Sequence, residues 1–126
     1  MLERVETPNA PEAIGPYSQA IKANGMMFLS GQIPLDPQTG AMITGRITAQ
    51  TKRVMENLRA VLEAEDLTFA NVVKTTIYLT DLADFAKVNE IYGSYFESDP
   101  PARATVQVAA LPKGANVEIE AVAVTG

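Results

Sequence analysis

The sequence predicts an α+β fold in which one β-sheet carries two helices on one of its faces. Segments with helical periodicity alternate with segments rich in β-branched and aromatic residues, in the order strands, helix, strand, helix, two strands. The chain has 126 residues, of which 47% are hydrophobic and 20% charged. These values are typical of one globular domain, and we expect residues 1–126 to form it.

The N-terminal part contains the first predicted strands. Residues 4–7 are expected to form a short edge strand that ends at the turn between Pro8 and Pro11. A hairpin follows, because Asn24-Gly25 is a typical two-residue turn and lies between the strand-like residues 18–24 and 26–30.

The central part contains both predicted helices, after a long surface loop at residues 34–40. Thr48 is the expected N-cap of the first helix, whose apolar stripe consists of Val54, Leu58, Val61 and Leu62. Residues 72–80 are rich in β-branched residues and predict a strand. Asp84 is the expected cap of the second helix, whose buried stripe consists of Phe85, Val88, Tyr92 and Phe96.

Residues 100–124 predict two strands joined by a Leu-Pro-Lys-Gly turn and paired with each other. Pro100 and Pro101 favour an extended approach to Arg103. Antiparallel pairing would bring Glu118 near Arg103, although spacing alone fixes neither the register nor the choice between Glu118 and Glu120. The two residues then form either a surface ion pair worth about 0 to 1 kcal/mol or a site. In a site, the arginine would bind a carboxylate through two hydrogen bonds and the glutamate would position a water.

The last strand has one uniformly apolar face, formed by Val117, Ile119, Ala121 and Ala123. The opposite face carries Glu118 and Glu120, followed by Val122 and Val124. Because two helices cover only one face of a sheet, the second face predicts a homo-oligomer. The alternative is that a loop covers Val122 and Val124.

The composition excludes several kinds of chemistry. The chain has no histidine and no cysteine, which excludes a Ser-His-Asp triad, thiolate catalysis and metal sites built on these ligands. We expect no metal, because no Asp-rich ligand loop is present. The net charge of −5 and the scattered basic residues argue against a nucleic-acid partner. Neither a signal peptide nor a membrane-spanning run is recognisable, so we expect a cytoplasmic protein with no membrane partner.

Three short features are candidates for ligand binding. The turn at residues 15–19 presents Tyr17, and Ser30-Gly31 ends a strand with a glycine that a ligand can approach closely. Asn89 lies on the second predicted helix. Each signal is weak alone, because turn residues more often shape turns than bind ligands.

Taken together, several segments resemble the Rid family (reactive intermediate deaminases, formerly YjgF), and in particular its archetypal RidA subgroup. These segments are residues 14–20, 29–34, 57–58, 73–76, 101–106 and 117–121. The similarity extends from about residue 5 to the C-terminus. It implies a chorismate-mutase-like α+β fold with one mixed sheet and two helices on one face. It also implies a homotrimer whose sheets pack into a central barrel, with ligand clefts between neighbouring subunits.

The activity implied by this resemblance is the hydrolysis of 2-imino acids, such as 2-iminobutanoate and 2-iminopropanoate, to 2-oxo acids and ammonia. No cofactor takes part. The substrates are reactive by-products of pyridoxal-phosphate enzymes such as threonine dehydratase. Two alternatives from other functional classes are an endoribonuclease that inhibits translation and a non-catalytic trimer that binds 2-oxo acids or acts like a chaperone.

The resemblance also implies roles for individual residues. Arg103 would bind the substrate carboxylate, and Glu118 would assist the attacking water or the departing ammonia. The rest of the pocket would be formed by Tyr17, Ser30, Gly31, Asn89 and Thr105. Thr105 occupies a position where many relatives carry cysteine, so any contribution of a thiol would be lost here.

Overall fold

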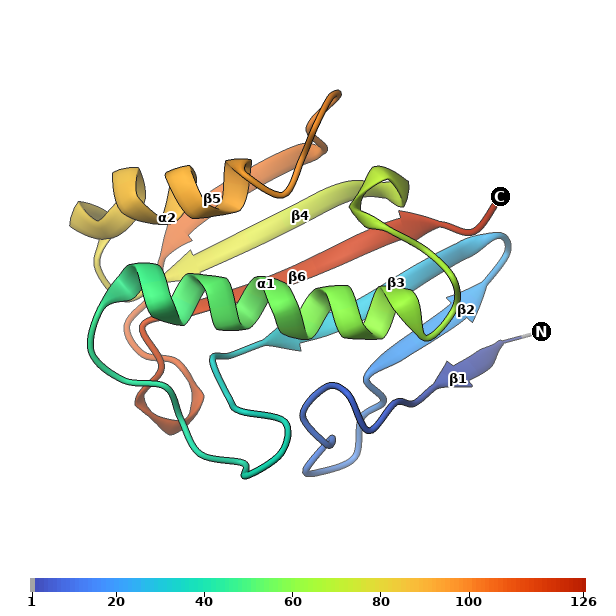
Figure 1. Ribbon diagram of the computed structural model, residues 1–126, viewed down its shortest axis with the longest axis horizontal. Coiled ribbons are helices and arrows are strands. Elements are labelled where there is room, and N and C mark those ends of the chain that lie inside the picture. The colour runs from blue at the N-terminus through green and yellow to red at the C-terminus, as the bar shows by residue number, and fades with distance from the viewer. Residues whose placement is uncertain (1) are drawn as a thin grey trace.

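A computed structural model describes residues 2–126 and contains one six-stranded sheet with two helices on one face (Figure 1). The strands are β1 (Glu3–Val5), β2 (Ala20–Ala23), β3 (Met26–Gln32), β4 (Val72–Leu79), β5 (Ala102–Gln107) and β6 (Val117–Val124). The helices are α1 (Ile47–Glu63) and α2 (Phe85–Gly93). The spatial order is β1-β2-β3-β6-β4-β5, and only β4 and β5 pair in parallel. The predicted α+β class with one mixed sheet is therefore confirmed.

The last two strands do not pair with each other, so the predicted β5–β6 hairpin is wrong. Strand β4 lies between them, parallel to β5 and antiparallel to β6. Helix α2 explains this arrangement, because a helical crossover after β4 returns the chain in the same direction and adds β5 beside β4 as a parallel strand. Arg103 is opposite Thr75 of β4, whereas Glu118 is opposite Tyr78 of the same strand.

The predicted hairpin near the N-terminus is confirmed. Asn24 and Gly25 have φ angles of 52° and 73°. Positive φ at both central residues is the requirement of a type I′ turn, whose twist matches that of the flanking strands. The turn connects β2 to β3 with Ala23 opposite Met26.

The predicted cap of the first helix is wrong, whereas Asp84 is the N-cap residue of the second helix, as predicted. Helix α1 begins at Ile47, one residue before Thr48, and its N-cap residue Arg46 makes no side-chain capping bond. Asp84 does precede α2 but makes no capping bond either. Asp81 instead accepts a hydrogen bond from the backbone N–H of Ala83 and starts a short 3₁₀ turn before the helix. Short-range propensity favoured Thr48, but this residue lies inside a helix that has already begun at Ile47.

The hydrophobic core lies between the helices and the sheet. The predicted stripe of α1 is fully buried, at 1% exposure or less: Val54, Leu58, Val61 and Leu62. The predicted stripe of α2 is only partly buried. Val88 and Tyr92 lie in the core, whereas Phe85 is 36% exposed and Phe96 lies beyond the last residue of the helix.

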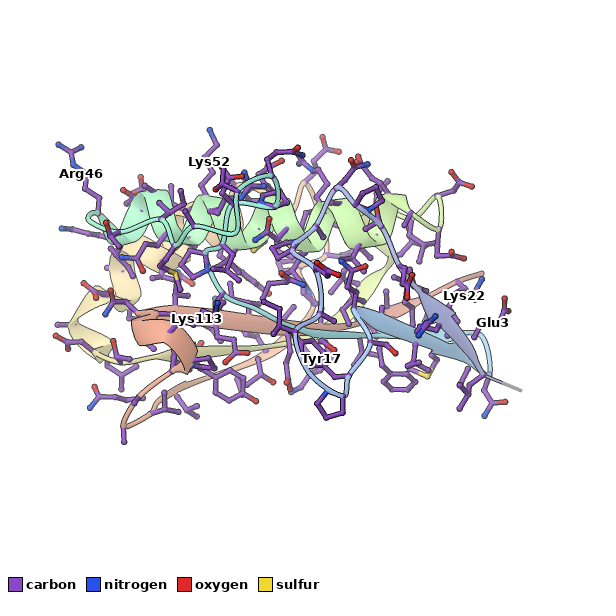
Figure 2. The ribbon with its side chains drawn as sticks, turned by 90° about the horizontal axis from the view of Figure 1, so that it is seen from below. Glu3, Tyr17, Lys22, Arg46, Lys52 and Lys113 are labelled. Carbon is purple, nitrogen blue, oxygen red and sulfur yellow. The ribbon has the colours of Figure 1, made fainter. Side chains whose placement is uncertain are left out.

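The second face of the sheet is uncovered in a single chain. Figure 2 shows the sheet nearly edge-on, with α1 on one side of it. On the opposite side, Phe28 is 46% exposed and Val106 is 42% exposed. Val122 and Val124 are partly exposed, so no loop buries them. Within residues 2–126, no helix combines the length and apolar character needed to cross a membrane.

Candidate functional site

The first group of candidate residues lines a cavity of about 560 Å³ at the end of β3. Four predicted residues meet there: Tyr17, Ser30, Gly31 and Glu118. Tyr17 comes from the loop before β2 and is 54% exposed. Ser30 and Gly31 lie where the β3–β6 register shifts between Leu29 and Gln32. Such irregularities change the direction of side chains and occur often beside active sites.

Gly31 has a steric role in this cavity. A Cβ atom at this position would overlap Oε2 of Glu118, and it would lie only 2.9 Å from Cδ and 3.1 Å from Cγ of the same side chain. The Glu118 side chain therefore lies directly over the glycine, in space that any other residue would fill. The glycine is required by this close approach.

Glu118 is the carboxyl group of this cavity whose electrostatic environment is perturbed. The carboxyl group is half-buried, and burial raises its pKa above the ordinary value of 4.5, with the neighbouring charge of Glu120 adding to the increase. A carboxyl group with a raised pKa exchanges protons more readily near neutral pH. Glu120 also lines the cavity but is exposed. The structure thus favours Glu118 over Glu120, a choice that sequence spacing left open.

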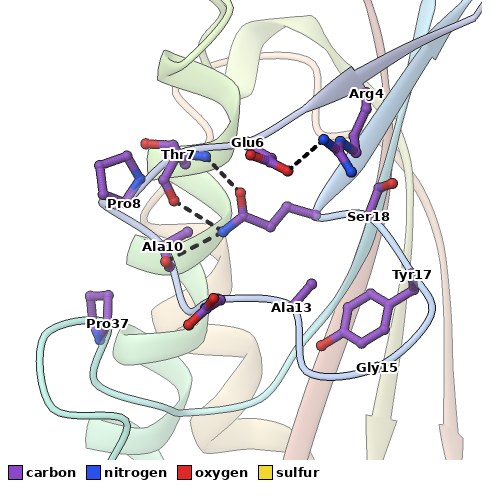
Figure 3. Close-up of a pocket in the computed structure, with 12 residues that line it drawn as sticks. Arg4, Glu6, Thr7, Pro8, Ala10, Ala13, Gly15, Tyr17, Ser18 and Pro37 are labelled. Atoms are coloured by element: carbon purple, nitrogen blue, oxygen red, sulfur yellow. Dashed lines mark hydrogen bonds and ion pairs between the residues drawn. The ribbon is translucent and has the colours of Figure 1, made fainter.

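The wall of the cavity is held by hydrogen bonds between the Tyr17 loop and β3. The hydroxyl of Ser30 donates to the backbone carbonyl of Ser18 at 2.6 Å, and the Ser30 N–H donates to the carbonyl of Gln19 at 3.0 Å. The buried Gln19 side chain bonds the backbone of Thr7 and Pro11. A second cavity of about 680 Å³ also has Tyr17 and Gln19 in its lining (Figure 3).

The second group of candidate residues surrounds Arg103 on the edge strand β5. Nη1 of Arg103 donates a hydrogen bond of 2.6 Å to Oδ1 of Asn89 on α2. The guanidinium carbon lies 5.4 Å from the ring centre of Phe85 and 5.1 Å from that of Tyr92. Arg103 is exposed and borders a surface hollow with Leu82, Phe85 and Thr105. The guanidinium therefore keeps donors available for an anionic ligand.

Thr105 lines the hollow beside Arg103, but its hydroxyl oxygen is buried. Among residues 2–126, its Oγ1 is the buried side-chain polar atom that lacks a hydrogen-bond partner. An unpaired buried hydroxyl is unfavourable by about 1 to 3 kcal/mol. Thr105 does border the hollow beside Arg103, and its place in the binding pocket stays a prediction.

The two groups lie on opposite faces of the sheet. Arg103 is on the helix-covered face and contacts α2, whereas Glu118 alternates with the buried Val117 and Ile119 and lies on the uncovered face. The expectation that pairing would bring Arg103 and Glu118 together within one chain is therefore wrong. A single site containing both residues requires two copies of the chain.

Sequence reasoning missed two aromatic partners of Arg103. Phe85 and Tyr92 were predicted only as members of a buried stripe, yet both rings contact the guanidinium. The spacing of Phe85, Asn89 and Tyr92, at i, i+4 and i+7, places all three on one face of α2 and was a usable signal. In the part of the chain that the structure describes, no cluster of three or more acidic residues could hold a metal ion.

Comparisons with known proteins agree with this description. Residues 7–125 match the family model described as Endoribonuclease L-PSP. The Myxococcus xanthus protein DfrA is 62% identical over 123 residues, which cover 96% of this chain and 94% of DfrA. Human 2-iminobutanoate/2-iminopropanoate deaminase is 50% identical over 122 residues, which cover 97% of this chain and 89% of the human protein. The chain belongs to the endoribonuclease L-PSP family, also known as the YjgF or Rid family.

A solved structure of the same family also matches the fold closely. Escherichia coli TdcF, crystallised with bound serine, has a TM-score of 0.94 and is 42% identical. The match covers 98% of this chain and 99% of the TdcF chain. Almost the whole architecture, including the order of the strands around both candidate groups, is therefore common to the two proteins.

Proposed function

We propose that this protein hydrolyses 2-imino acids to 2-oxo acids and ammonia, at sites formed between neighbouring copies of the chain. The Arg103 group of one copy would face the Glu118 group of the next. The observation that carries the proposal is that the two groups have complementary chemistry. Arg103 is a cation that can bind a carboxylate, and Glu118 is a carboxyl group with a raised pKa. The name of the human relative, at 50% identity, supports the same reaction.

In the proposed mechanism, Arg103 binds the substrate carboxylate through two N–H donors, while a third remains bonded to Asn89. Glu118 accepts a proton from a water molecule as the water oxygen attacks C2 of the substrate, which reacts as the N-protonated imine, so that its nitrogen becomes a neutral amino group. The resulting carbinolamine has hydroxyl and amino groups on C2. Glu118 then gives its proton to the amino nitrogen and the C–N bond breaks as ammonia leaves. The C2 hydroxyl releases its proton to solvent, which gives the 2-oxo acid and leaves Glu118 as the carboxylate with which the reaction began.

This reaction needs only modest assistance. An imine carbon is already electrophilic, so positioning the substrate carboxylate and one water beside a carboxyl group is sufficient. No cofactor or metal has a role in the proposed mechanism. Serine in the TdcF crystal structure supports the ligand class, since an amino acid carries a carboxylate and a C2 nitrogen as a 2-imino acid does.

The uncovered sheet face supports the proposed assembly. Phe28, Val106 and Val122 remain exposed or partly exposed on that face, and a second copy would bury them. Assembly through this face would also bring Glu118, which lies on it, toward a neighbouring chain. We propose a homotrimer with the sheets facing a central barrel.

A coupled assay tests the proposed activity. Threonine dehydratase generates 2-iminobutanoate, and semicarbazide traps the free imine; catalytic amounts of this protein should suppress trapping while 2-oxobutanoate still forms. Arg103→Ala should lose about 2 to 4 kcal/mol of transition-state stabilisation, because a charge-assisted contact is removed. Full activity of Arg103→Ala in an intact oligomer would refute the proposed role of Arg103.

Two other functions correspond to specific observations. The description of the family model favours an endoribonuclease, and in that case the protein should cleave single-stranded RNA and bind it in a salt-dependent manner. The net charge of −5 disfavours this outcome. The bound serine in TdcF favours a ligand-binding protein, and in that case 2-oxobutanoate should bind through Arg103 while trapping of the imine is unchanged.

A further inference from the structure

Tyr92 lies beneath Arg103 and is the one buried aromatic residue of α2. Its side chain is 4% exposed, and its ring centre is 5.1 Å from the guanidinium carbon of Arg103. Burial raises the pKa of the Tyr92 hydroxyl, so it remains a neutral phenol near neutral pH. The ring thus offers a fixed, neutral π face to a cation that is otherwise exposed.

Thr75 fixes the other end of the tyrosine. The hydroxyl groups of Thr75 and Tyr92 form a buried hydrogen bond of 2.6 Å. Thr75 is also the residue of β4 that lies opposite Arg103 in the parallel β4–β5 pairing. Thr75 therefore pairs with the backbone of Arg103 and also hydrogen-bonds the hydroxyl of Tyr92, whose ring lies beneath the Arg103 side chain.

Phe85 provides a useful contrast. Its ring centre lies at a similar distance from the guanidinium, 5.4 Å, but the residue is 36% exposed and has no polar group to anchor it. Asn89 bonds one nitrogen of Arg103 but is itself exposed. Of the three α2 side chains that touch Arg103, only Tyr92 is locked by both burial and a hydrogen bond.

We propose that Tyr92, locked by Thr75, is a positioning residue that acts through Arg103. The ring holds the guanidinium in the orientation that presents its free N–H donors to the ligand carboxylate. The effect on turnover rests on the proposed function, but the effect on binding of a carboxylate ligand does not. Tyr92 does not touch the ligand in this proposal.

The test compares Tyr92→Leu with the matched control Tyr95→Leu. Tyr95 belongs to the same aromatic cluster and packs on Phe69 with ring centres 5.3 Å apart, but no contact joins it to Arg103. Tyr92→Leu should weaken 2-oxobutanoate binding, followed by NMR titration, by about threefold to tenfold. It should raise KM for the imine by a similar factor with little change in kcat, because ligand and transition state lose the same contact. Tyr95→Leu should change neither quantity.

Two further variants separate positioning from general stability. Tyr92→Phe keeps the ring but removes the hydroxyl that Thr75 holds, so it should lower stability and give binding intermediate between that of the native protein and that of Tyr92→Leu. In an Arg103→Ala background, Tyr92→Leu should have no additional effect on binding, since the residue through which it acts is absent. An additional loss in that background, or native-like binding in Tyr92→Leu, would overturn the proposal.

A measurement on the native protein covers the case in which Tyr92→Leu does not fold. Protons of the Arg103 guanidinium should show an upfield NMR shift, because they lie over an aromatic ring face. The Tyr92→Phe variant should retain that shift. An unshifted Arg103 Hε signal in the native protein would overturn the proposal. Absence of imine turnover in the native protein, together with the predicted binding pattern, would reject the deaminase function but leave the role of Tyr92 standing.

Discussion

Replacing Gly31 by alanine gives a sharp test of the Glu118 half of the site. The new methyl group would occupy space now taken by the Glu118 carboxyl group, with Cδ at 2.9 Å and Cγ at 3.1 Å. Unstrained carbon contacts begin at about 3.5 Å, so both carbons must move by several tenths of an ångström and Oε2 by about 1 Å. The backbone itself does not resist the change, because Gly31 is not among the glycines with positive φ.

The expected effects on stability and activity differ widely. Alanine lowers the entropy of the unfolded chain and so favours folding by about 0.5 to 1 kcal/mol. Moving Glu118 from its preferred rotamer costs about 0.5 to 1.5 kcal/mol. These contributions nearly cancel, so the free energy of unfolding should change little. A catalytic group displaced by about 1 Å can lower the rate about 100-fold.

The assay is imine trapping at saturating substrate, combined with urea unfolding. Gly93→Ala is the matched control, because a Cβ at Gly93 has no atom within 4 Å and the residue ends helix α2. That variant should keep full activity. Near-native activity in Gly31→Ala, with its fold intact, would show that the position of Glu118 over Gly31 is not needed for the reaction.

Two further predictions concern Glu118 itself and the loop that carries Tyr17. Burial and the charge of Glu120 raise the native-state pKa of Glu118 above 4.5. Between pH 4.5 and that pKa, the folded protein therefore binds more protons than the unfolded protein. The contribution of this carboxyl group to the free energy of unfolding consequently falls as the pH rises through this range. Glu118→Gln should therefore increase the free energy of urea unfolding at neutral pH and have little effect below pH 4.5; an equal effect at both pH values would contradict this. Gln19→Ala should destabilise the protein by about 1 to 3 kcal/mol, since it leaves backbone groups of Thr7 and Pro11 unpaired. Exposed Gln38→Ala is its control, and equal urea midpoints for the two variants would refute the bracing role of Gln19.

The elements of the fold were largely predictable because local patterns determine them. Asn24-Gly25 can adopt positive φ at low cost, and it formed the expected turn. The period-two pattern of β6 correctly separated the buried Val117 and Ile119 from Glu118. Family motifs indicated the candidate residues, and the structure groups all of them into two clusters. Sequence spacing could not distinguish Glu118 from Glu120. The difference between them is structural: Glu118 is half-buried and lies against Gly31, whereas Glu120 is exposed.

Strand pairing was not predictable from the same patterns. Whether β5 pairs with β6 or with β4 depends on the crossover through α2, which is a long-range feature of the chain. The error mattered, because the predicted hairpin placed Arg103 beside Glu118. Strand β4 instead separates them, and they lie on opposite faces of the sheet. Contacts between copies of the chain leave no local periodicity that identifies which residues meet.

Subunit mixing tests the central claim most directly. Arg103→Ala and Glu118→Gln, each expected to have little activity alone, would be unfolded together and refolded in equal amounts. If each site takes Arg103 from one copy and Glu118 from another, about one quarter of the sites should contain both native residues, and about one quarter of native activity should return. If mixed oligomers form, as native mass spectrometry can verify, but activity stays at the level of the separate variants, the two residues do not act together in a shared site.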